Sequence, residues 1–257
     1  MNLLICNDDG IDAEGILMLA DALADEADIY VAAPHTQRSA GGHGITFNKP
    51  VAATEVTFPK AKLAFSIEGT PADCIKMGLE LMSERGIKID KVFSGINHGG
   101  NLGTDAIYSG TVAAAVEGAI NGIPSVAVSI NARKPQQYNT ARKLAIRALR
   151  LDSAAYDNRM ILNINIPDLP ESEIKGIKLV GQGLREYEKE FVRGTDADGA
   201  TTFEYSGYPV YYDDICCDTS DVGAHQEGYV AITPLQFDLT NYYLLEKLRA
   251  SGIDSKL

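Results

Sequence analysis

The strongest constraint on the fold is a regular alternation of short apolar segments with segments of helical periodicity. Residues 3–6 predict a buried strand, and residues 14–27 then carry apolar side chains at helical spacing. Residues 29–33 predict the next strand, and the Thr-Pro-Ala-Asp of residues 70–73 has the composition of a helix start. Further strands are predicted at 63–67, 91–94, 125–130 and 160–166, and further helices at 111–120 and 138–149. Strand–helix–strand units form right-handed crossovers, so we expect an α/β protein with a mostly parallel sheet.

The last third of the chain has a different pattern. Charged residues alternate with aromatic ones through residues 186–215, which is typical of long hairpin-like strands, and a strand at 229–233 and a helix at 241–250 follow. The hairpin segment has the aromatic residues Tyr187, Phe191, Phe203, Tyr205, Tyr208, Tyr211 and Tyr212. From the pattern alone these aromatics either form an interface with another subunit or pack back on their own domain.

Length and charge narrow the class of protein. A chain of 257 residues with 45% apolar residues suits one domain covering residues 1–257, and no stretch is long and apolar enough to cross a membrane. The first residues lack the cationic start of a signal peptide, so we expect a cytoplasmic protein. The net charge of −12 disfavours binding to a nucleic-acid polymer, and a phosphate-bearing substrate would need a metal cation, a helix N-terminus or local basic residues.

Several conspicuous residues have ordinary explanations. Because no C-x-x-C pair is present, the four cysteines are interpreted as reduced, mostly structural thiols. The acidic residues Asp213, Asp214 and 218–221 are interpreted as a solvated loop. His43 and His98 lie in the loops described next, and each is interpreted as a solvated residue in preference to a catalytic one. Arg38 lies in the same loops and either contacts a phosphate or is solvated.

Polar and glycine-rich loops follow three of the predicted strands. They are residues 7–10 (Asn-Asp-Asp-Gly), residues 34–43, and residues 95–103, where the ten residues from Ser94 to Gly103 contain four glycines. Ligands of parallel α/β sheets bind outside the carboxyl ends of the strands, so we expect the three loops to share one edge of the sheet.

The donor atoms of these loops predict a metal ion of the hard type. Asp8 and Asp9 are consecutive carboxylates, and Gly10 permits the turn that would bring both onto one cation. Oxygen donors without a cysteine cluster suit Mg²⁺, Mn²⁺ or Ca²⁺ better than zinc. The competing interpretation is a polar turn that caps the next helix.

The third loop leads to a helix that begins near Ser109-Gly110-Thr111. Hydroxyls and free N–H groups at a helix N-terminus form an anion cradle, and plain N-capping by Ser109 or Thr111 is compatible with that role. The sequence lacks the motifs of several other enzyme classes. It has no dinucleotide-binding G-x-G-x-x-G after the first strand, no P-loop, no G-x-S-x-G elbow of the α/β-hydrolases and no H-E-x-x-H zinc motif.

Five segments together resemble the SurE family of 5′/3′-nucleotidases. They are Asn7-Asp8-Asp9-Gly10; Arg38-Ser39 with residues 42–46 (Gly-His-Gly-Ile-Thr); residues 69–74 (Gly-Thr-Pro-Ala-Asp-Cys); residues 94–97 with Gly99, Asn101 and residues 108–115; and residues 228–235 with Asp238 and Thr240. Ala40 and Ala231 depart from the residues usual in the family, and neither position is a proposed ligand.

The resemblance implies a Rossmann-like three-layer sandwich with a C-terminal β-hairpin arm, residues 180–220, that joins subunits into a homodimer or homotetramer. It implies one divalent cation, Mg²⁺ or Mn²⁺, per subunit, held by Asp8, Asp9, Ser39 and Asn97. It also implies hydrolysis of nucleoside 5′- and 3′-monophosphates to nucleoside and phosphate, and some members of the family also cut short polyphosphate.

The working hypothesis is metal-assisted hydrolysis. Asp8 positions or deprotonates the attacking water, and Asn101, Ser109, Gly110 and Thr111 bind the phosphoryl oxygens, which makes Asp8 and Asn101 the predicted catalytic residues. Three alternatives stay open at this point: hydrolysis through a covalent aspartyl-phosphate on Asp8, an enzyme resembling the nucleoside hydrolases, and a non-catalytic module that binds a nucleotide or a metal.

Overall fold

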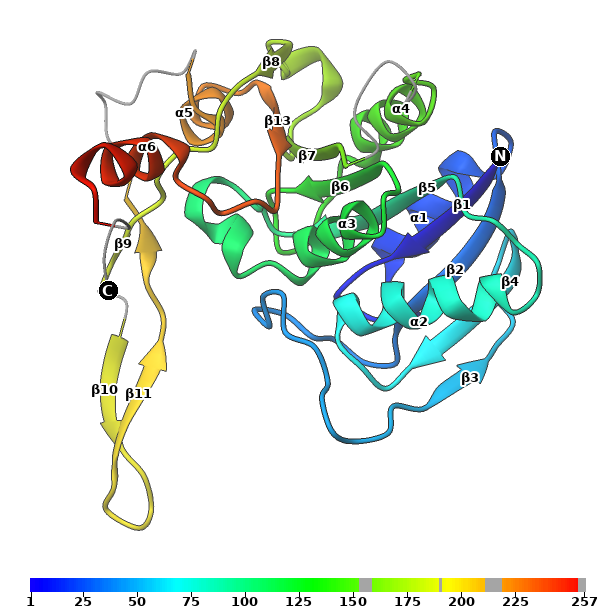
Figure 1. The fold of residues 1–257 in the computed structure, drawn as a ribbon, viewed down its shortest axis with the longest axis horizontal. Coiled ribbons are helices and arrows are strands. Elements are labelled where there is room, and N and C mark those ends of the chain that lie inside the picture. Colours follow the sequence, from blue (N-terminus) through cyan, green and yellow to red (C-terminus); the bar gives the residue numbers. More distant parts are fainter. Residues whose placement is uncertain (153–158, 190, 211–218, 254–257) are drawn as a thin grey trace.

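The computed structural model describes residues 1–152, 159–189, 191–210 and 219–253. Within these residues nine strands form one sheet in the order β3-β4-β2-β1-β5-β6-β7-β13-β8 (Figure 1). The strands are β1 Asn2–Cys6, β2 Asp28–Pro34, β3 Ala53–Glu55, β4 Ala61–Ile67, β5 Lys91–His98, β6 Ser125–Ile130, β7 Ile161–Ile166, β8 Ile177–Leu179 and β13 Val230–Leu235. The pairs β3·β4 and β7·β13 are antiparallel and the other neighbours are parallel, as the α/β prediction requires.

Helices cover both faces of the sheet and give the expected three layers. They are α1 Glu14–Leu23, α2 Pro71–Ser83, α3 Gly110–Ile120 and α4 Tyr138–Leu149. The alternation of β1 shows the two faces: Leu3 and Ile5 pack with α1 and α4, whereas Leu4 and Cys6 pack with α2. No helix in the described ranges combines the length and the apolar character needed to span a membrane.

The start of α2 is built as its sequence predicts. Thr70 is the N-cap, Pro71 occupies the first turn, and Asp73 completes a capping box by accepting from the Thr70 N–H at 2.9 Å. Cys6 and Cys74 are buried free thiols, which agrees with a structural role, while Cys216 and Cys217 lie outside the described residues.

The main differences from the sequence prediction are the ends of β5 and α1 and two short strands that were not predicted. β5 was expected to end at Ser94 but runs on to His98, because a bulge between Gly95 and Asn97 lets the glycine-rich segment stay paired with β6. α1 ends at Leu23 instead of residue 27. The short edge strands β3 and β8 were not predicted, since three residues give too little periodicity to detect.

The prediction of a solvated loop at residues 218–221 was wrong for Asp221. Asp221 is fully buried at the start of α5, Asp221–Gln226, and its carboxylate accepts from the N–H groups of Gly103 and Gly183, each at 2.8 Å. The acid is buried because it satisfies main-chain donors of two separate segments. Asp213, Asp214 and Asp218 lie outside the described residues.

The predicted hairpin projects from the body of the molecule (Figure 1). β10 Phe191–Thr195 pairs antiparallel with β11 Thr201–Tyr205, and nearer the body β9 Tyr187–Glu188 pairs with β12 Tyr208–Pro209. Both strands of the outer pair are exposed throughout, so this hairpin does not pack back on its own domain. Tyr211 and Tyr212 lie outside the described residues.

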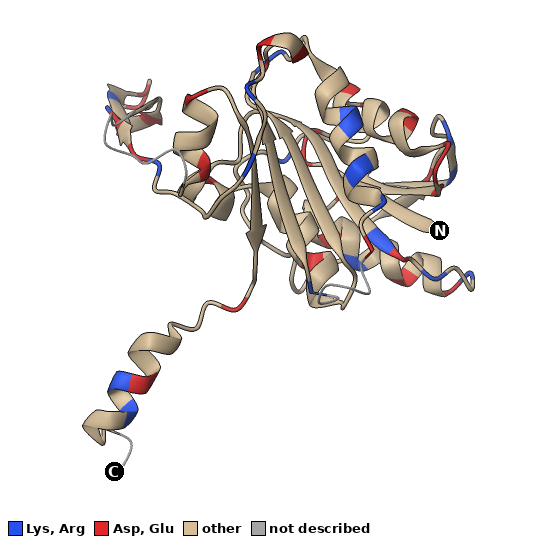
Figure 2. Ribbon diagram, turned by 90° about the horizontal axis from the view of Figure 1, so that it is seen from above, with Lys and Arg blue, Asp and Glu red and all other residues tan. Residues whose placement is uncertain are grey.

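The terminal helix α6, Tyr242–Ser251, also stands away from the sheet (Figure 2). None of its residues is buried, and it exposes Tyr243 and Leu244, while Leu239 before it is 95% exposed. The hairpin and α6 thus expose apolar side chains on the surface of the single chain.

Candidate metal and phosphate site

The three loops singled out in the sequence lie at one edge of the sheet. β1 is the central partner of β2 and β5, and all three strands run parallel. The carboxyl ends of these strands, at Cys6, Pro34 and His98, are therefore neighbours, and the segments that follow them share the edge at which α/β proteins bind ligands.

Asp8 lies against the start of α3. Its side chain is 4% exposed, and its Oδ1 accepts from the Thr111 hydroxyl at 2.5 Å. The absence of a side chain at Gly110 makes this approach possible, since a Cβ there would lie 2.8 Å from the Asp8 Cβ. The main-chain oxygen of Asp8 accepts from the Arg38 N–H at 2.7 Å, which fixes the first loop to the second.

Burial raises the pKa of Asp8 to about 6, while the hydrogen bond from Thr111 lowers it and the neighbouring charge of Asp9 raises it further. In the described part of the chain neither Asp8 nor Asp9 has an ion-pair partner. Two adjacent carboxylates, one of them buried, therefore lack a compensating charge.

Asp9 connects all three loops. Its Oδ1 accepts from Gln37 Nε2 at 3.3 Å, and the same nitrogen donates to Ser39 Oγ at 2.9 Å. The Asp9 Oδ2 lies 3.4 Å from the main-chain nitrogen of His98 at the end of β5. Gln37 was not predicted as a site residue, and nothing in its sequence context distinguishes it from a solvated glutamine.

Asn97 is 8% exposed and lies one residue before His98. Its Nδ2 donates to the Gly99 carbonyl at 2.7 Å, which leaves its Oδ1 as the atom able to bind a cation. Within the described residues no three His, Cys, Asp or Glu side chains gather in one place. A cation at this edge would therefore be held by two carboxylates together with neutral hydroxyl and amide oxygens, a donor set that fits Mg²⁺ or Mn²⁺.

The residues predicted to bind phosphate lie in two places: Ser109, Gly110 and Thr111 at the start of α3, and Asn101 against β6 and β7. Ser109 is the N-cap of α3, and its Oγ accepts from the Val112 N–H at 3.0 Å, so its own hydroxyl proton is still available to a ligand. Thr111 donates its proton to Asp8 and so holds the carboxylate in place. Gly110 brings the N-terminus of α3 close to Asp8.

Asn101 has a different set of contacts. It is 7% exposed, and its Nδ2 donates to Ser129 Oγ of β6 at 2.8 Å. Its main-chain groups bond to Asn163 and Asn165 of β7. Among the described residues its polar partners belong to β6 and β7, and neither Asp8 nor Asp9 is one of them.

The histidines of the loops are not simply solvated. His43 Nε2 lies 2.9 Å from the buried carboxylate of Glu117, which also bonds to Lys76 Nζ at 2.9 Å. His98 Nε2 lies 2.6 Å from the Tyr138 hydroxyl. His43 thus fixes the second loop to α3, whereas Arg38 is exposed.

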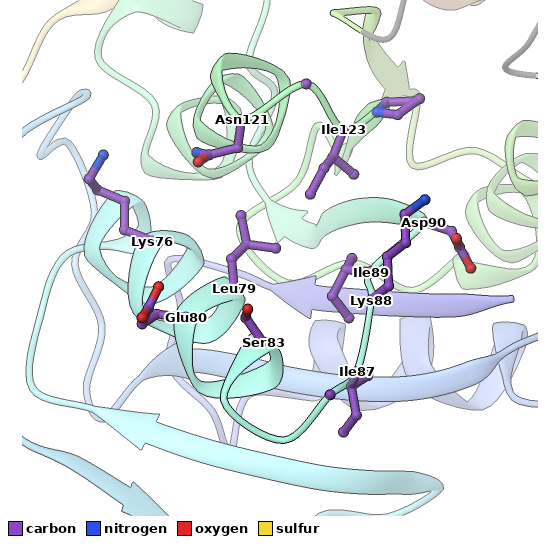
Figure 3. Close-up of a pocket in the computed structure, with 13 residues that line it drawn as sticks. Lys76, Leu79, Glu80, Ser83, Ile87, Lys88, Ile89, Asp90, Asn121 and Ile123 are labelled. Carbon is purple, nitrogen blue, oxygen red and sulfur yellow. The ribbon is translucent and has the colours of Figure 1, made fainter.

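A hollow elsewhere on the surface has no part in this arrangement. It has a volume of about 690 Å³ and lies between α2 and the residues that precede β5 and β6 (Figure 3). These are the amino ends of the strands, so the hollow is at the opposite edge of the sheet from Asp8 and Asp9.

Comparison with known proteins decides the family. The model of the family described as survival protein SurE matches residues 3–189. The chain belongs to the SurE family. Its 5′-nucleotidase SurE relative from Alkaliphilus metalliredigens is 44% identical over 261 aligned residues, which cover 99% of this chain and 100% of that protein. The 5′-nucleotidase SurE of Pelotomaculum thermopropionicum is 43% identical over 250 residues, covering 97% of this chain and 94% of that one.

A solved structure supports the fold as well. The crystal structure of the SurE protein from Aquifex aeolicus matches 98% of this chain and 100% of its own, with a TM-score of 0.81 and 34% sequence identity. The resemblance stated from the five sequence segments is therefore confirmed, and so is the α/β fold with its extra C-terminal hairpin.

Proposed function

We propose that this chain hydrolyses nucleoside 5′-monophosphates to nucleoside and phosphate, with one divalent cation held by Asp8, Asp9, Ser39 and Asn97. The observation that carries the proposal is the uncompensated pair Asp8 and Asp9, of which Asp8 is buried against the N-terminus of α3. The relatives named 5′-nucleotidase SurE, at 43% and 44% identity over nearly the whole chain, support the same activity.

In this proposal each residue has a separate task. The cation, when bound, supplies positive charge that attracts the phosphate and acidifies a bound water. Asp8, oriented by Thr111, positions or deprotonates the attacking water. Ser109 and the main chain at the start of α3 donate hydrogen bonds to the phosphoryl oxygens, and Asn101 contributes an amide donor.

A phosphate-release assay with adenosine 5′-monophosphate tests this proposal. Release should require Mg²⁺ or Mn²⁺ and stop with excess chelator. Asp8→Asn and Asp9→Asn should each lose most turnover while remaining folded, because the amide keeps the shape and removes the charge. Asp12→Asn is the matched control, since Asp12 is an exposed aspartate of the same loop.

The same assay separates the alternatives. A nucleoside hydrolase would release free ribose or ribose phosphate in place of inorganic phosphate, and a binding module would bind the nucleotide without turnover. Activity on 3′-monophosphates and on short polyphosphate stays a prediction, and running these substrates beside the 5′-monophosphate tests it.

We also propose that the arm of residues 180–220 joins subunits into a homodimer or homotetramer. The exposed aromatics of the hairpin support this, since Phe191, Phe203 and Tyr205 pack on one another yet are each at least 60% exposed. The root of the arm is fixed to the body near the site, where Arg185 forms an ion pair with Asp105 at 2.9 Å.

The predicted cytoplasmic location can be tested by cell fractionation.

A further inference from the structure

Two asparagines occupy core positions of β7 where its alternation predicts apolar residues. Ile164 and Ile166 point to the face covered by α1 and α4, and Ile161 contacts α3 on the other face. Asn163 and Asn165 share the face of Ile161 and are 1% and 0% exposed. A primary amide is unfavourable in such a place unless its hydrogen bonds are made, so their partners are informative.

The partner that Asn163 and Asn165 share is the main chain of Asn101. The Asn165 Oδ1 accepts from the Asn101 N–H at 2.7 Å, and its Nδ2 donates to the Asn101 carbonyl at 3.1 Å. Asn163 Nδ2 donates to the same carbonyl at 2.8 Å. Asn165 therefore bonds to both the N–H and the carbonyl of Asn101, as the backbone of a neighbouring strand would. Asn163 adds a second donor to the carbonyl.

The side chain of Asn101 is held from the adjacent strand. Its Nδ2 donates to Ser129 Oγ at 2.8 Å, and Ser129 is the direct register partner of Asn165 in the β6·β7 pair. Ser129 is fully buried. Three buried side chains from two strands thus determine the position of one residue.

This support is needed because Asn101 lies beyond the end of β5. The strand ends at His98, and Gly99 and Gly100 separate Asn101 from the sheet's own ladder. Gly99 has a φ of +126°, a conformation that side chains rarely adopt. Other contacts hold the neighbouring residues of this loop, such as Gly100 with Asn131 and Gly103 with Asp221, but the main chain of Asn101 itself is bonded to the amides of β7.

We propose that Asn163 and Asn165 are positioning residues that hold Asn101 for contact with the substrate phosphate. The inference rests on the proposed function, in which the second proton of the Asn101 amide faces the phosphoryl group. Neither β7 residue touches the substrate in this account; each acts through Asn101. Their amides are retained in the core because an apolar residue of similar size cannot fix the Asn101 main chain.

A double-mutant cycle on phosphate release tests the proposal. Asn101→Ala keeps the main chain but removes the side chain that contacts phosphate. Asn165→Leu removes the hydrogen bonds of the Asn165 amide to the Asn101 main chain. Each single variant should lower kcat for adenosine 5′-monophosphate at least about tenfold. If Asn165 acts through Asn101, the double variant should be no slower than Asn101→Ala alone.

Two further measurements separate positioning from stability. Mn²⁺ affinity of the Asn165→Leu protein without substrate should stay within about twofold of the wild type, because Asp8 and Asp9 are untouched. Thr233→Val is the matched control: Thr233 is buried on the same face beside Asn163, its hydroxyl has no hydrogen-bond partner among the residues that the structure describes, and kcat should not change. Should Asn165→Leu not fold, Asn163→Ser, which removes one of two donors to the same carbonyl, is put through the same cycle.

The outcomes are distinct. Multiplicative losses in the double variant, or wild-type kcat in both β7 variants while Asn101→Ala is impaired, would overturn the positioning role and leave the proposed function standing. An Asn101→Ala protein of wild-type kcat would also overturn it. Absence of phosphate release by the wild type from every nucleoside monophosphate would overturn the proposed function, and this inference with it.

Discussion

Gly110→Ala is a perturbation that moves the proposed metal ligand without changing any of its donor atoms. A Cβ at position 110 would lie 2.8 Å from the Asp8 Cβ, 3.0 Å from its Oδ2 and 3.0 Å from the Pro71 Cγ. Ordinary contact begins at 3.4 Å, so the Asp8 side chain has to shift by about 0.6 Å. The added Cβ would also press on Pro71 in the first turn of α2, so it has contacts on a second side as well.

The expected loss follows from that displacement. A misplacement of about 1 Å in a catalytic group lowers the rate about 100-fold, so we expect kcat to fall by about 10-fold to 100-fold. Stability should change much less. Overpacking costs about 1–3 kcal/mol, and replacing glycine by alanine in a helix returns about 1 kcal/mol, so the net loss is at most about 2 kcal/mol.

The assay measures phosphate release from adenosine 5′-monophosphate over a Mn²⁺ titration, with thermal unfolding of the same samples. Gly41→Ala is the matched control: it adds the same methyl group to the second loop, where the nearest atom, the Arg38 carbonyl oxygen, is 3.5 Å away. A Gly110→Ala protein with the kcat and metal titration of the wild type would show that the position of Asp8 against α3 does not matter for turnover.

Three further predictions follow. Asn97→Ala should need more metal for half-maximal activity and recover in part with added cation; a metal titration identical to that of the wild type would remove Asn97 from the ligand set. Burial, with a further effect from Arg185, lowers the pKa of His225 to about 4, so the folded protein keeps this histidine neutral while the unfolded chain binds a proton below about pH 6.5. The contribution of His225 to the free energy of unfolding should therefore be fully present near pH 7 and about 2 kcal/mol smaller at pH 5. In urea unfolding, the free energy of unfolding should fall less between pH 7 and pH 5 in His225→Phe than in the wild type. An equal fall in the two proteins would refute this assignment. Replacing residues 186–215 by a short Gly-Ser linker should give a smaller assembly by light scattering, and a monomeric intact protein at micromolar concentration would contradict the role of the arm.

The parts of the fold set by local pattern were predictable from the sequence. The strands β1, β2 and β6 and the start of α2 follow from apolar runs and from capping residues whose effects are confined to a few neighbours. The meeting of the loops after β1, β2 and β5 at one edge follows from parallel pairing alone. These features need no knowledge of distant contacts.

Features that depend on distant partners could not be predicted. Glycines at 95 and 99 indicated a loop, yet β5 continues through the first of them because β6 offers paired backbone groups. Asp221 resembled a solvated acid because its partners at 103 and 183 are far away in the sequence. The amides of β7 gave a usable signal, since two asparagines alternate with isoleucine in a buried strand, but only the structure shows that they hold Asn101.

The proposed activity depends first on a single divalent cation held by Asp8 and Asp9 at this edge of the sheet. The direct measurement is Mn²⁺ binding without substrate in the wild type, Asp9→Asn and the exposed control Asp12→Asn. Binding is monitored through the electron paramagnetic resonance signal of free Mn²⁺. We expect one Mn²⁺ per chain in the wild type and the control, with affinity at least about tenfold weaker in Asp9→Asn. Equal Mn²⁺ affinity and stoichiometry in Asp9→Asn and the wild type would show that Asp9 is not a ligand of the cation.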